Sequence, residues 1–489
     1  MFELHHLSAL EQGEWLRRGR ISPRELVEHY LARIERHNPV VGALTVVDAE
    51  RALARAEALE GLVARSAPLW GIPIADKELV QRAGQRTTFG SRLRADHVAS
   101  TDDELVRHLD AAGAISLGAT AAPEFGLPSY TESRVAPPAR NPYDLDRGAG
   151  GSSGGAAAAV AAGLLPVAPG SDGGGSIRIP AAACGLVGLK PSRGRVPAGS
   201  GLDRLAGLVV PGPIARTVAD AALMLDALIA AAPWEFATRA PIDPPLASGR
   251  EHPHGGGPLL SAAVRGEGRY QLGVMTMSPW DEYTDIALEP EARWALDEAV
   301  AGFSALGHGI DDITLDPEPD YGRHFRTVWM ASAAGIPART PDELALLEPL
   351  TQWLVGQGRA LSAEALAEAL AWLSGFERRV IRRLSSVDAV LTPALAMTPR
   401  PLGWYDAEDA DRNFTQQVQY TPYTSFVNVA GLPALTLPVG LTPAGSDQPG
   451  LPMGLQLIGR PGGEATLLAL GAQWERAWGA HRITHPPQW

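Results

Sequence analysis

The stretch from Arg147 to Arg195 reads RGAGGSSGGAAAAVAAGLLPVAPGSDGGGSIRIPAAACGLVGLKPSRGR, and it decides the fold. It holds two glycine-rich turns that carry serine, GGSSGG at 150–155 and GGGS at 173–176. Glycine at this density costs backbone entropy, which favours tight turns or a close approach of the backbone to another group. The segment Ala156–Ala162 between them has almost no side chains and ends at Gly163, so it predicts a helix that neighbouring elements approach closely. We expect the two turns to be buried side by side, although two surface turns would share this composition.

Outward from this stretch, helical patterns alternate with short apolar runs in both directions. The clearest helix start is the capping box at Ser22–Glu25, where proline takes the first helical position. Periodicity predicts helices at residues 22–34, 49–62, 102–112, 218–230 and 290–305. Short buried strands are predicted at residues 71–77, 114–117, 272–275, 389–393 and 433–440. This alternation favours a layered α/β fold.

The domain organisation follows from the same alternation. A length of 489 residues alone would suggest about three domains, but large α/β enzymes often form one unit. We expect one domain over residues 1–489, divided into N-terminal helices at 1–65, a glycine-rich core at 66–230, a loop connection at 231–269 and a second half at 270–489. The second half contains a mainly helical region at 318–385 and a polar, aromatic segment at 403–418 that we expect to act as a lid.

The composition narrows the classes of partner. A formal net charge of −13 disfavours non-specific binding to nucleic acid or to an anionic membrane surface. The single cysteine, Cys184, excludes an internal disulfide and fits a reducing compartment. Residues 1–10 lack the pattern of a signal peptide, and no apolar run approaches the roughly 20 residues of a spanning helix. We therefore expect a cytoplasmic protein with no nucleic-acid or membrane partner.

Metal and cofactor motifs are missing from the sequence. The twelve histidines show no H-E-x-x-H spacing, and one cysteine cannot build a zinc cluster. The glycine-rich stretch contains neither the GxxxxGK[ST] of a P-loop nor a G-x-G-x-x-G that follows a strand and opens a helix. We expect no metal and no cofactor.

A nucleophilic serine remains, and two arrangements are open. In the first, Gly150–Gly154 satisfies the G-x-S-x-G pattern of a nucleophile elbow, and His254–Gly257 reads HGGG like an oxyanion motif. Glycine–serine runs match such short patterns easily, and here the HGGG follows the elbow instead of preceding it. A separate signal is Lys77, which ends an apolar strand where lysine is unusual unless its ammonium head reaches solvent.

The second arrangement depends on longer segments spread through the chain. They lie at residues 71–79, 141–197, 212–220, 392–393, 428–433 and 454–460. Together these segments resemble the amidase signature family of serine hydrolases, and the resemblance covers nearly the whole chain. The spacing of Ser152 and Ser176 matches the family's pair of serines. The resemblance implies a three-layer α/β/α sandwich with a large mixed central sheet.

The resemblance also implies a catalytic triad. Ser176 would be the nucleophile, Ser152 the bridging serine that follows a cis peptide bond to Gly151, and Lys77 the base. A serine hydroxyl is a poor nucleophile and needs a neighbouring base. Lysine can be that base only when neutral, so burial must lower its pKa from about 10.4.

Further roles follow from the same resemblance. The backbone amides of the GGGS turn would form the oxyanion hole, at Gly173, Gly174, Gly175 and Ser176. Asp172 and Arg178 would brace this loop as an ion pair, and Ser153 would support the hydrogen-bond network. Tyr130 and Thr131 are candidates for the substrate pocket, with walls from the 318–385 helices and the 403–418 segment.

The activity implied by the resemblance is hydrolysis of a carboxylic amide, linear or cyclic, through an acyl-enzyme on Ser176. A urethane (carbamate) or ester could use the same triad, which would make the protein a urethanase or esterase. A third reading is the glutaminase subunit of an amidotransferase, but Tyr420–Phe426 lacks the acidic residue that we expect for a glutamine site. We expect a small-molecule substrate and water as partners, and a homodimer stays open.

Overall fold

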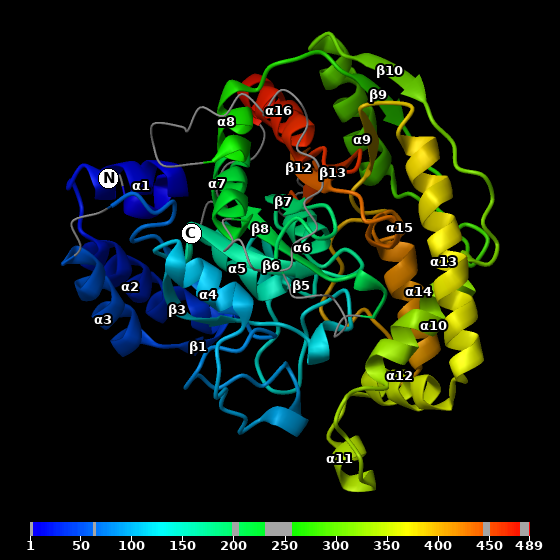
Figure 1. Ribbon diagram of the computed structural model, residues 1–489, viewed down its shortest axis with the longest axis horizontal. Helices are drawn as coiled ribbons and strands as arrows, with labels where there is room; N and C mark the ends of the chain where they lie inside the picture. The colour runs from blue at the N-terminus through cyan, green and yellow to red at the C-terminus, as the bar shows by residue number, and fades with distance from the viewer. Residues whose placement is uncertain (1–2, 62–64, 198–204, 230–256, 444–449, 480–488) are drawn as a thin grey trace.

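The N-terminal helices lie at one side of the molecule, and helices α10 to α14 lie at the other (Figure 1). The computed structural model describes residues 3–61, 65–197, 205–229, 257–443, 450–479 and 489. The N-terminal elements are η1 (Leu4–His6), α1 (Ala9–Arg17), α2 (Pro23–Val41) and α3 (Ala49–Glu60). The predicted start of α2 is confirmed, because the Ser22 hydroxyl accepts from the Glu25 amide while the Ser22 amide donates to the Glu25 carboxylate.

A small sheet carries the predicted lysine at its edge. It has the order β1 (Leu44–Val47), β3 (Ile115–Thr120) and β2 (Pro73–Lys77), with β1 antiparallel and β2 parallel to β3. The connection from β2 to β3 contains α4 (Glu104–Ala111). All five residues of β2 are buried, and β2 lies beside β6 of the larger sheet. The side chain of Lys77 is therefore held between two sheets and away from solvent.

The larger sheet has eight strands in the order β10-β9-β11-β13-β12-β7-β8-β6. Their bounds are β6 (Val167–Asp172), β7 (Val187–Lys190), β8 (Val210–Ala215), β9 (Gln271–Val274), β10 (Gly309–Asp312), β11 (Ala389–Pro393), β12 (Ala434–Leu441) and β13 (Pro452–Gly459). The pairs β10–β9 and β9–β11 are parallel, and the remaining pairs are antiparallel. The predicted large mixed sheet is confirmed.

Helices cover both faces of this sheet. Gln456 of β13 points toward α6 (Arg178–Ala183), where its amide oxygen accepts from Arg178 at 2.7 Å. Alternate residues of a strand face opposite sides, so Leu455 and Leu457 point to the other face. Their cross-strand partners on β12 lie against Gly471 of α16 (Glu464–Trp474). The helices α7 (Val218–Ile229) and α9 (Pro290–Ala305) contact α16 on that face. The predicted three-layer sandwich is therefore present.

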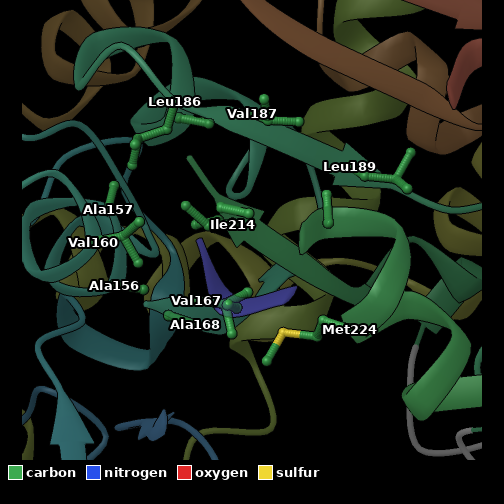
Figure 2. Close-up of a cluster of buried hydrophobic side chains, with 14 of the residues drawn as sticks. Ala156, Ala157, Val160, Val167, Ala168, Leu186, Val187, Leu189, Ile214 and Met224 are labelled. Carbon is green, nitrogen blue, oxygen red and sulfur yellow. The ribbon is translucent and has the colours of Figure 1, made fainter. Parts of the chain in front are cut away.

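The alanine helix is the centre of the core. It is α5 (Gly154–Ala161), and each of its eight residues is buried. Figure 2 shows Ala156, Ala157 and Val160 of this helix in one buried cluster with Val167, Ala168, Leu186, Val187, Leu189, Ile214 and Met224. At Gly155 a Cβ would collide with the Ala121 amide nitrogen. The predicted close packing around this helix is confirmed.

The second half contributes a bundle of helices and its own aromatic core. The helices are α10 (Tyr321–Ala333), α11 (Pro341–Ala345), α12 (Pro349–Ala360), α13 (Ala363–Leu384), α14 (Ala410–Tyr420) and α15 (Ser425–Val429). The prediction of a mainly helical region at 318–385 is confirmed. The segment 403–418 consists of irregular residues followed by most of α14, whose Phe414 and Val418 are buried.

The predicted loop connection at 231–269 is wrong at its end. Residues 230–256 lie outside the described residues, and so does most of the HGGG motif at 254–257. Residues 258–265 form a helix, α8 (Pro258–Arg265), with proline in its first turn and Gly266 in the left-handed region after it. Four apolar residues of α8 are buried, and the helix packs on α7 and α16. The glycine- and proline-rich sequence before it hid this pattern.

Short elements complete the described chain. They are η2 (Arg92–Arg94), η3 (Glu124–Gly126), β4 (Arg140–Asn141), β5 (Asp144–Gly148), η4 (Leu205–Gly207) and η6 (Glu475–Gly479), of which β4 and β5 form a two-stranded sheet. Among the helices of the described ranges, none is both long enough and apolar enough to cross a membrane.

Candidate active site

Three separate segments bring the predicted lysine and serines together. Lys77 ends strand β2, Ser152 lies in the turn that precedes α5, and Ser176 lies in the turn between β6 and α6. The Lys77 Nζ donates to the Ser152 Oγ at 2.9 Å. Ser152 and Ser176 line the same cavity of about 990 Å³. All three side chains are buried, with exposed fractions of 1%, 2% and 8% for Lys77, Ser152 and Ser176.

Burial sets the protonation of Lys77. Removal of the ammonium group from water lowers the pKa of Lys77 to about 7, although the negative charge of Asp172 opposes this shift. Besides Ser152, the amine contacts Ser171, donating to its Oγ at 3.0 Å and to its carbonyl oxygen at 3.4 Å. Near neutral pH a large fraction of the molecules therefore carries a neutral amine beside two hydroxyl groups.

The two serine turns are tied directly to each other. A cis peptide bond joins Gly151 and Ser152, as the resemblance implies. The Ser153 amide donates to the Ser176 carbonyl oxygen at 3.2 Å, and the Ser153 hydroxyl donates to the Ser171 carbonyl oxygen at 3.4 Å. Ser153 thus links the turn of Ser152 to the turn of Ser176.

A fully buried ion pair lies beside the turn of Ser176. Arg178 binds both carboxylate oxygens of Asp172, with two N–O distances of 2.9 Å. Burial alone would raise the pKa of Asp172, but the Arg178 guanidinium and its hydrogen bonds hold that pKa well below its usual range. Arg178 also donates to Gln456 at 2.7 Å and to Asn428 at 2.6 Å. The pair is therefore held by partners from several segments and has little freedom to move.

Asn428 and Gln456 were not among the site residues predicted from the sequence. Asn428 also donates to the carboxylate of Asp172 at 2.9 Å, so it completes the coordination of the ion pair. A signal for both residues was present, because each is a polar side chain inside an apolar stretch. Buried polar groups are nearly always hydrogen-bonded, so such residues indicate a buried partner.

Among the amides predicted for the oxyanion hole, that of Gly175 already has an acceptor. It donates to the Asp172 carboxylate at 2.7 Å, which braces the turn. Its φ of +133° is a conformation that favours glycine, and a Cβ there would lie 2.5 Å from the Thr424 Oγ1. The Thr424 hydroxyl donates to the Gly174 carbonyl oxygen at 2.6 Å and fixes the turn from its other side.

Three amides of the turn keep free donors. Within the described part of the chain, no acceptor takes the backbone N–H of Gly173, Gly174 or Ser176. Gly173 and Ser176 line the cavity of about 990 Å³, and Gly174 and Ser176 line a second, smaller cavity. Buried amides without partners beside a cavity are suited to bind an anionic oxygen.

The predicted substrate residues Tyr130 and Thr131 line neither of the two cavities at Ser176. The Thr131 hydroxyl is used inside the protein, because it donates to the Gly150 carbonyl oxygen at 2.9 Å. The Tyr130 ring stacks on Tyr405, with centroids 4.1 Å apart. In these contacts the two residues support the turn of Ser152 and the adjoining segment.

Two cavities meet at Ser176. The first, which we call the wide cavity, is the 990 Å³ space, with walls that include Leu79, Val80, Asp103, Glu104, Leu205 and Ile336. The second, which we call the aromatic pocket, has a volume of about 60 Å³ and is lined by Trp280, Phe325, Trp329, Phe414 and Val418, among others. Trp329 lines both, whereas Ser152 lines only the wide cavity. The helices of 318–385 and the 403–418 segment thus supply aromatic and apolar walls, as expected.

Comparison with known sequences gives one family over most of the chain. A family model described as Amidase matches residues 25–468. The putative amidase AmiB2 of Mycobacterium tuberculosis is 38% identical over 490 residues, which cover 98% of each chain. One subunit of the glutamyl-tRNA(Gln) amidotransferase of Moorella thermoacetica is 35% identical over 508 residues, again covering 98% of each chain.

Solved structures agree with this result. A 6-aminohexanoate cyclic dimer hydrolase superposes with a TM-score of 0.85 at 31% identity, covering 99% of both chains. A bacterial aryl acylamidase of the amidase signature family superposes with a TM-score of 0.82 at 26% identity, covering 96% of both chains.

Proposed function

Since the chain belongs to the amidase signature family and is a hydrolase of carbon–nitrogen bonds other than peptide bonds, we propose that it cleaves a carboxylic amide through an acyl-enzyme on Ser176. One observation carries this proposal. The buried amine of Lys77, with its pKa lowered to about 7, contacts the Ser152 hydroxyl in a cavity that Ser176 also lines. The reaction needs only the amide, water and groups of this chain.

The first half of the reaction transfers the acyl group to the protein. The Ser176 Oγ attacks the amide carbon while its proton passes to the Ser152 Oγ, and the Ser152 proton passes to the neutral Lys77 Nζ. The carbonyl oxygen becomes an oxyanion in the tetrahedral intermediate. When the C–N bond breaks, Ser152 gives a proton to the leaving nitrogen and regains one from Lys77. The products are the free amine, the acyl ester of Ser176 and a neutral lysine.

The second half releases the acid by the same relay. A water molecule attacks the ester carbon and loses a proton to Ser152, which again hands one to Lys77. Collapse of the second tetrahedral intermediate breaks the bond to the Ser176 Oγ, which takes the proton back through Ser152. The carboxylic acid leaves, and Lys77 ends neutral, so the relay is ready for another turnover.

The nucleophile turn supports the charged intermediate. The free amides of Gly173, Gly174 and Ser176 are suited to donate to the oxyanion, and each such donor is typically worth about 10²–10³ in turnover. The Asp172–Arg178 pair and Thr424 hold the turn in place. A donor set that is fixed before the reaction avoids the cost of reorganising it in the transition state.

A fluorophosphonate probe followed by peptide mass spectrometry tests the nucleophile. We expect the label on Ser176, with no labelling of Ser176→Ala and slower labelling of Ser152→Ala. A label on Ser152 in the wild-type protein would instead support the nucleophile-elbow arrangement at Gly150–Gly154. The same relay could act on carbamates or esters, so hydrolysis rates for an amide, a carbamate and an ester of one acid rank the three substrate classes.

A further inference from the structure

We propose that the acyl half of the substrate is a short, uncharged, apolar group that occupies the aromatic pocket, and that the larger half is the amine, in the wide cavity. This inference rests on the proposed function, because it uses the position of the bridging serine to tell the two halves apart. It names the substrate class of the site: amides of small neutral acids with bulky amines.

The position of Ser152 assigns each half to a cavity. In the proposed reaction Ser152 delivers a proton to the leaving nitrogen, so the amine must lie on the Ser152 side of the scissile bond. The wide cavity is lined by Ser152 and by Ser171, the other hydroxyl that contacts Lys77. The aromatic pocket meets Ser176 and Gly174 but not Ser152. Because the amine occupies the wide cavity, the acyl group on the Ser176 oxygen lies in the aromatic pocket.

The size of the aromatic pocket limits the acyl group. One water molecule needs roughly 10–15 Å³ of cavity volume. The aromatic pocket, with a volume of about 60 Å³, therefore has room for about five non-hydrogen atoms. The walls have little freedom to open, because Phe325 stacks on Trp329 at 5.6 Å and meets Trp280 edge-on at 5.4 Å. Trp280 is also fixed by a hydrogen bond from its indole N–H to the Ser425 hydroxyl at 2.9 Å.

The chemistry of the aromatic pocket excludes a charged acyl group. The described residues of its lining include no acidic or basic side chain. Two of its polar members, Gln417 and Thr421, are engaged with the protein: the Gln417 amide oxygen accepts from the Ser129 amide at 2.8 Å, and the Thr421 hydroxyl donates to the Gln417 carbonyl oxygen at 2.9 Å. A charge placed there would lose its hydration without gaining a partner, which is costly.

Glutamine would require the opposite arrangement. As an amide substrate it presents a charged amino-acid head on the acyl side and releases only ammonia on the amine side. The acyl side here is small and uncharged, and the amine side is the large one. Glutamine should therefore be a poor substrate, and this separates the chain from the glutaminase alternative.

Two series of amides test the assignment on the full-length protein. In the first, p-nitroaniline stays constant and the acyl group grows from acetyl through butyryl to octanoyl. We expect kcat/KM to fall by at least about tenfold between butyryl and octanoyl, because the pocket rejects added methylenes. In the second, propionyl stays constant and the amine grows from ammonia to aniline and naphthylamine. Here kcat/KM is expected to hold or rise, and L-glutamine is expected to show no hydrolysis above background.

Variants of one wall of each cavity provide matched controls. Val418→Phe fills the aromatic pocket and should shorten the longest acyl group that is hydrolysed. Phe414→Ala removes a wall of that pocket alone and should raise the octanoyl-to-butyryl ratio at least about tenfold. Val80→Phe narrows the wide cavity and should lower the rates for large amines while leaving the acyl-length ratio unchanged. Circular dichroism identifies any variant that fails to fold. If one of the two aromatic-pocket variants does not fold, the other still tests the assignment.

The outcomes separate this inference from the proposed function. Equal or faster hydrolysis of octanoyl amides, or an acyl-length ratio that shifts in Val80→Phe but not in Phe414→Ala, would overturn the assignment while the amidase chemistry stood. Hydrolysis of glutamine in preference to the anilides would overturn it as well. No hydrolysis of any amide, together with no fluorophosphonate label on Ser176, would refute the proposed function and this inference together.

Discussion

Two buried lysines lie close to the nucleophile turn, and their surroundings differ. Lys77 and Lys190 each end a strand, are 1% exposed, and have a pKa that burial lowers to about 7. The Lys77 amine contacts the Ser152 and Ser171 hydroxyls. The Lys190 amine donates to the Pro191 carbonyl oxygen at 2.9 Å. A lowered pKa therefore does not by itself identify a catalytic base, because the base also needs a proton donor within reach.

The two lysines belong to regions with different tasks. We call Lys77, Ser152 and Ser176 the relay, and we call Asp172, Arg178 and their partners the frame. The relay is held by hydroxyl groups and contains no fixed charge apart from the one that the lysine can carry. The frame is a buried ion pair with several further hydrogen bonds, and Lys190 lies within its electrostatic reach. Damage to the relay should reduce turnover, and damage to the frame should reduce stability.

The largest effect is expected in the relay. Lys77→Met removes the base but keeps most of the buried volume, so turnover of an anilide should fall by about 10³-fold, within the 10²–10⁴ range for general base catalysis. The midpoint of thermal unfolding should change little, because the amine forms no part of the frame. Full activity of the folded variant at neutral pH would refute the role of Lys77.

The frame is tested by Arg178→Met. This variant leaves the Asp172 carboxylate buried without its counter-charge, so the free energy of unfolding should fall by about 3–5 kcal/mol. Chemical denaturation followed by fluorescence measures this difference. An unchanged free energy of unfolding would show that Asn428 and the backbone amides suffice to hold Asp172. It would also remove the distinction between frame and relay.

The contact between frame and oxyanion donors is tested by a pair of glycine variants. Gly175→Ala places a Cβ 2.5 Å from the Thr424 Oγ1 at a φ of +133°, and should displace the turn and cost about 10²-fold in turnover. The control is Gly174→Ala, whose Cβ meets nothing closer than 3.9 Å. Equal losses in the two variants would mean that Gly175 has no special role.

The smallest effect on turnover is expected at Lys190. Lys190→Met should change turnover by less than about tenfold, or 1.4 kcal/mol, because no proton of the relay reaches this amine. It should, however, flatten the dependence of stability on pH. The folded protein releases the Lys190 proton near pH 7 and the unfolded chain only near 10.5, so stability rises with pH across this window. A loss of turnover as large as that of Lys77→Met would contradict the comparison.

Local sequence signals predicted the elements well. Helix α9 and strand β11 match their predicted bounds because each has a strong apolar pattern with proline at a boundary. Helix α8 was missed because the glycine- and proline-rich sequence before it indicated a loop. Lys77, Ser152 and Ser176 were predicted from a motif, and the structure adds the contact between the first two.

Features that arise from distant segments were not predictable. The partners of Arg178 on Asn428 and Gln456 lie 250 and 278 residues away in the chain, so no local pattern joins them. The use of the Gly175 amide by Asp172 depends on the shape of the turn, which the letters GGGS do not determine. Phe325 and Trp329 lie one helical turn apart on α10, but the aromatic pocket also needs Trp280 and Phe414 from other segments of the chain.

The central claim is that neutral Lys77 removes the proton of Ser176 through Ser152. The rate of Ser176 phosphonylation by a fluorophosphonate, measured against pH in wild type and in Lys77→Met, tests this claim most directly. For the wild type we expect the rate to rise about tenfold per pH unit up to a pKa of about 7 and then to level off, because only the deprotonated amine accepts the proton. In Lys77→Met the rate should be low and should lack this inflection. The same inflection in the variant would contradict the account.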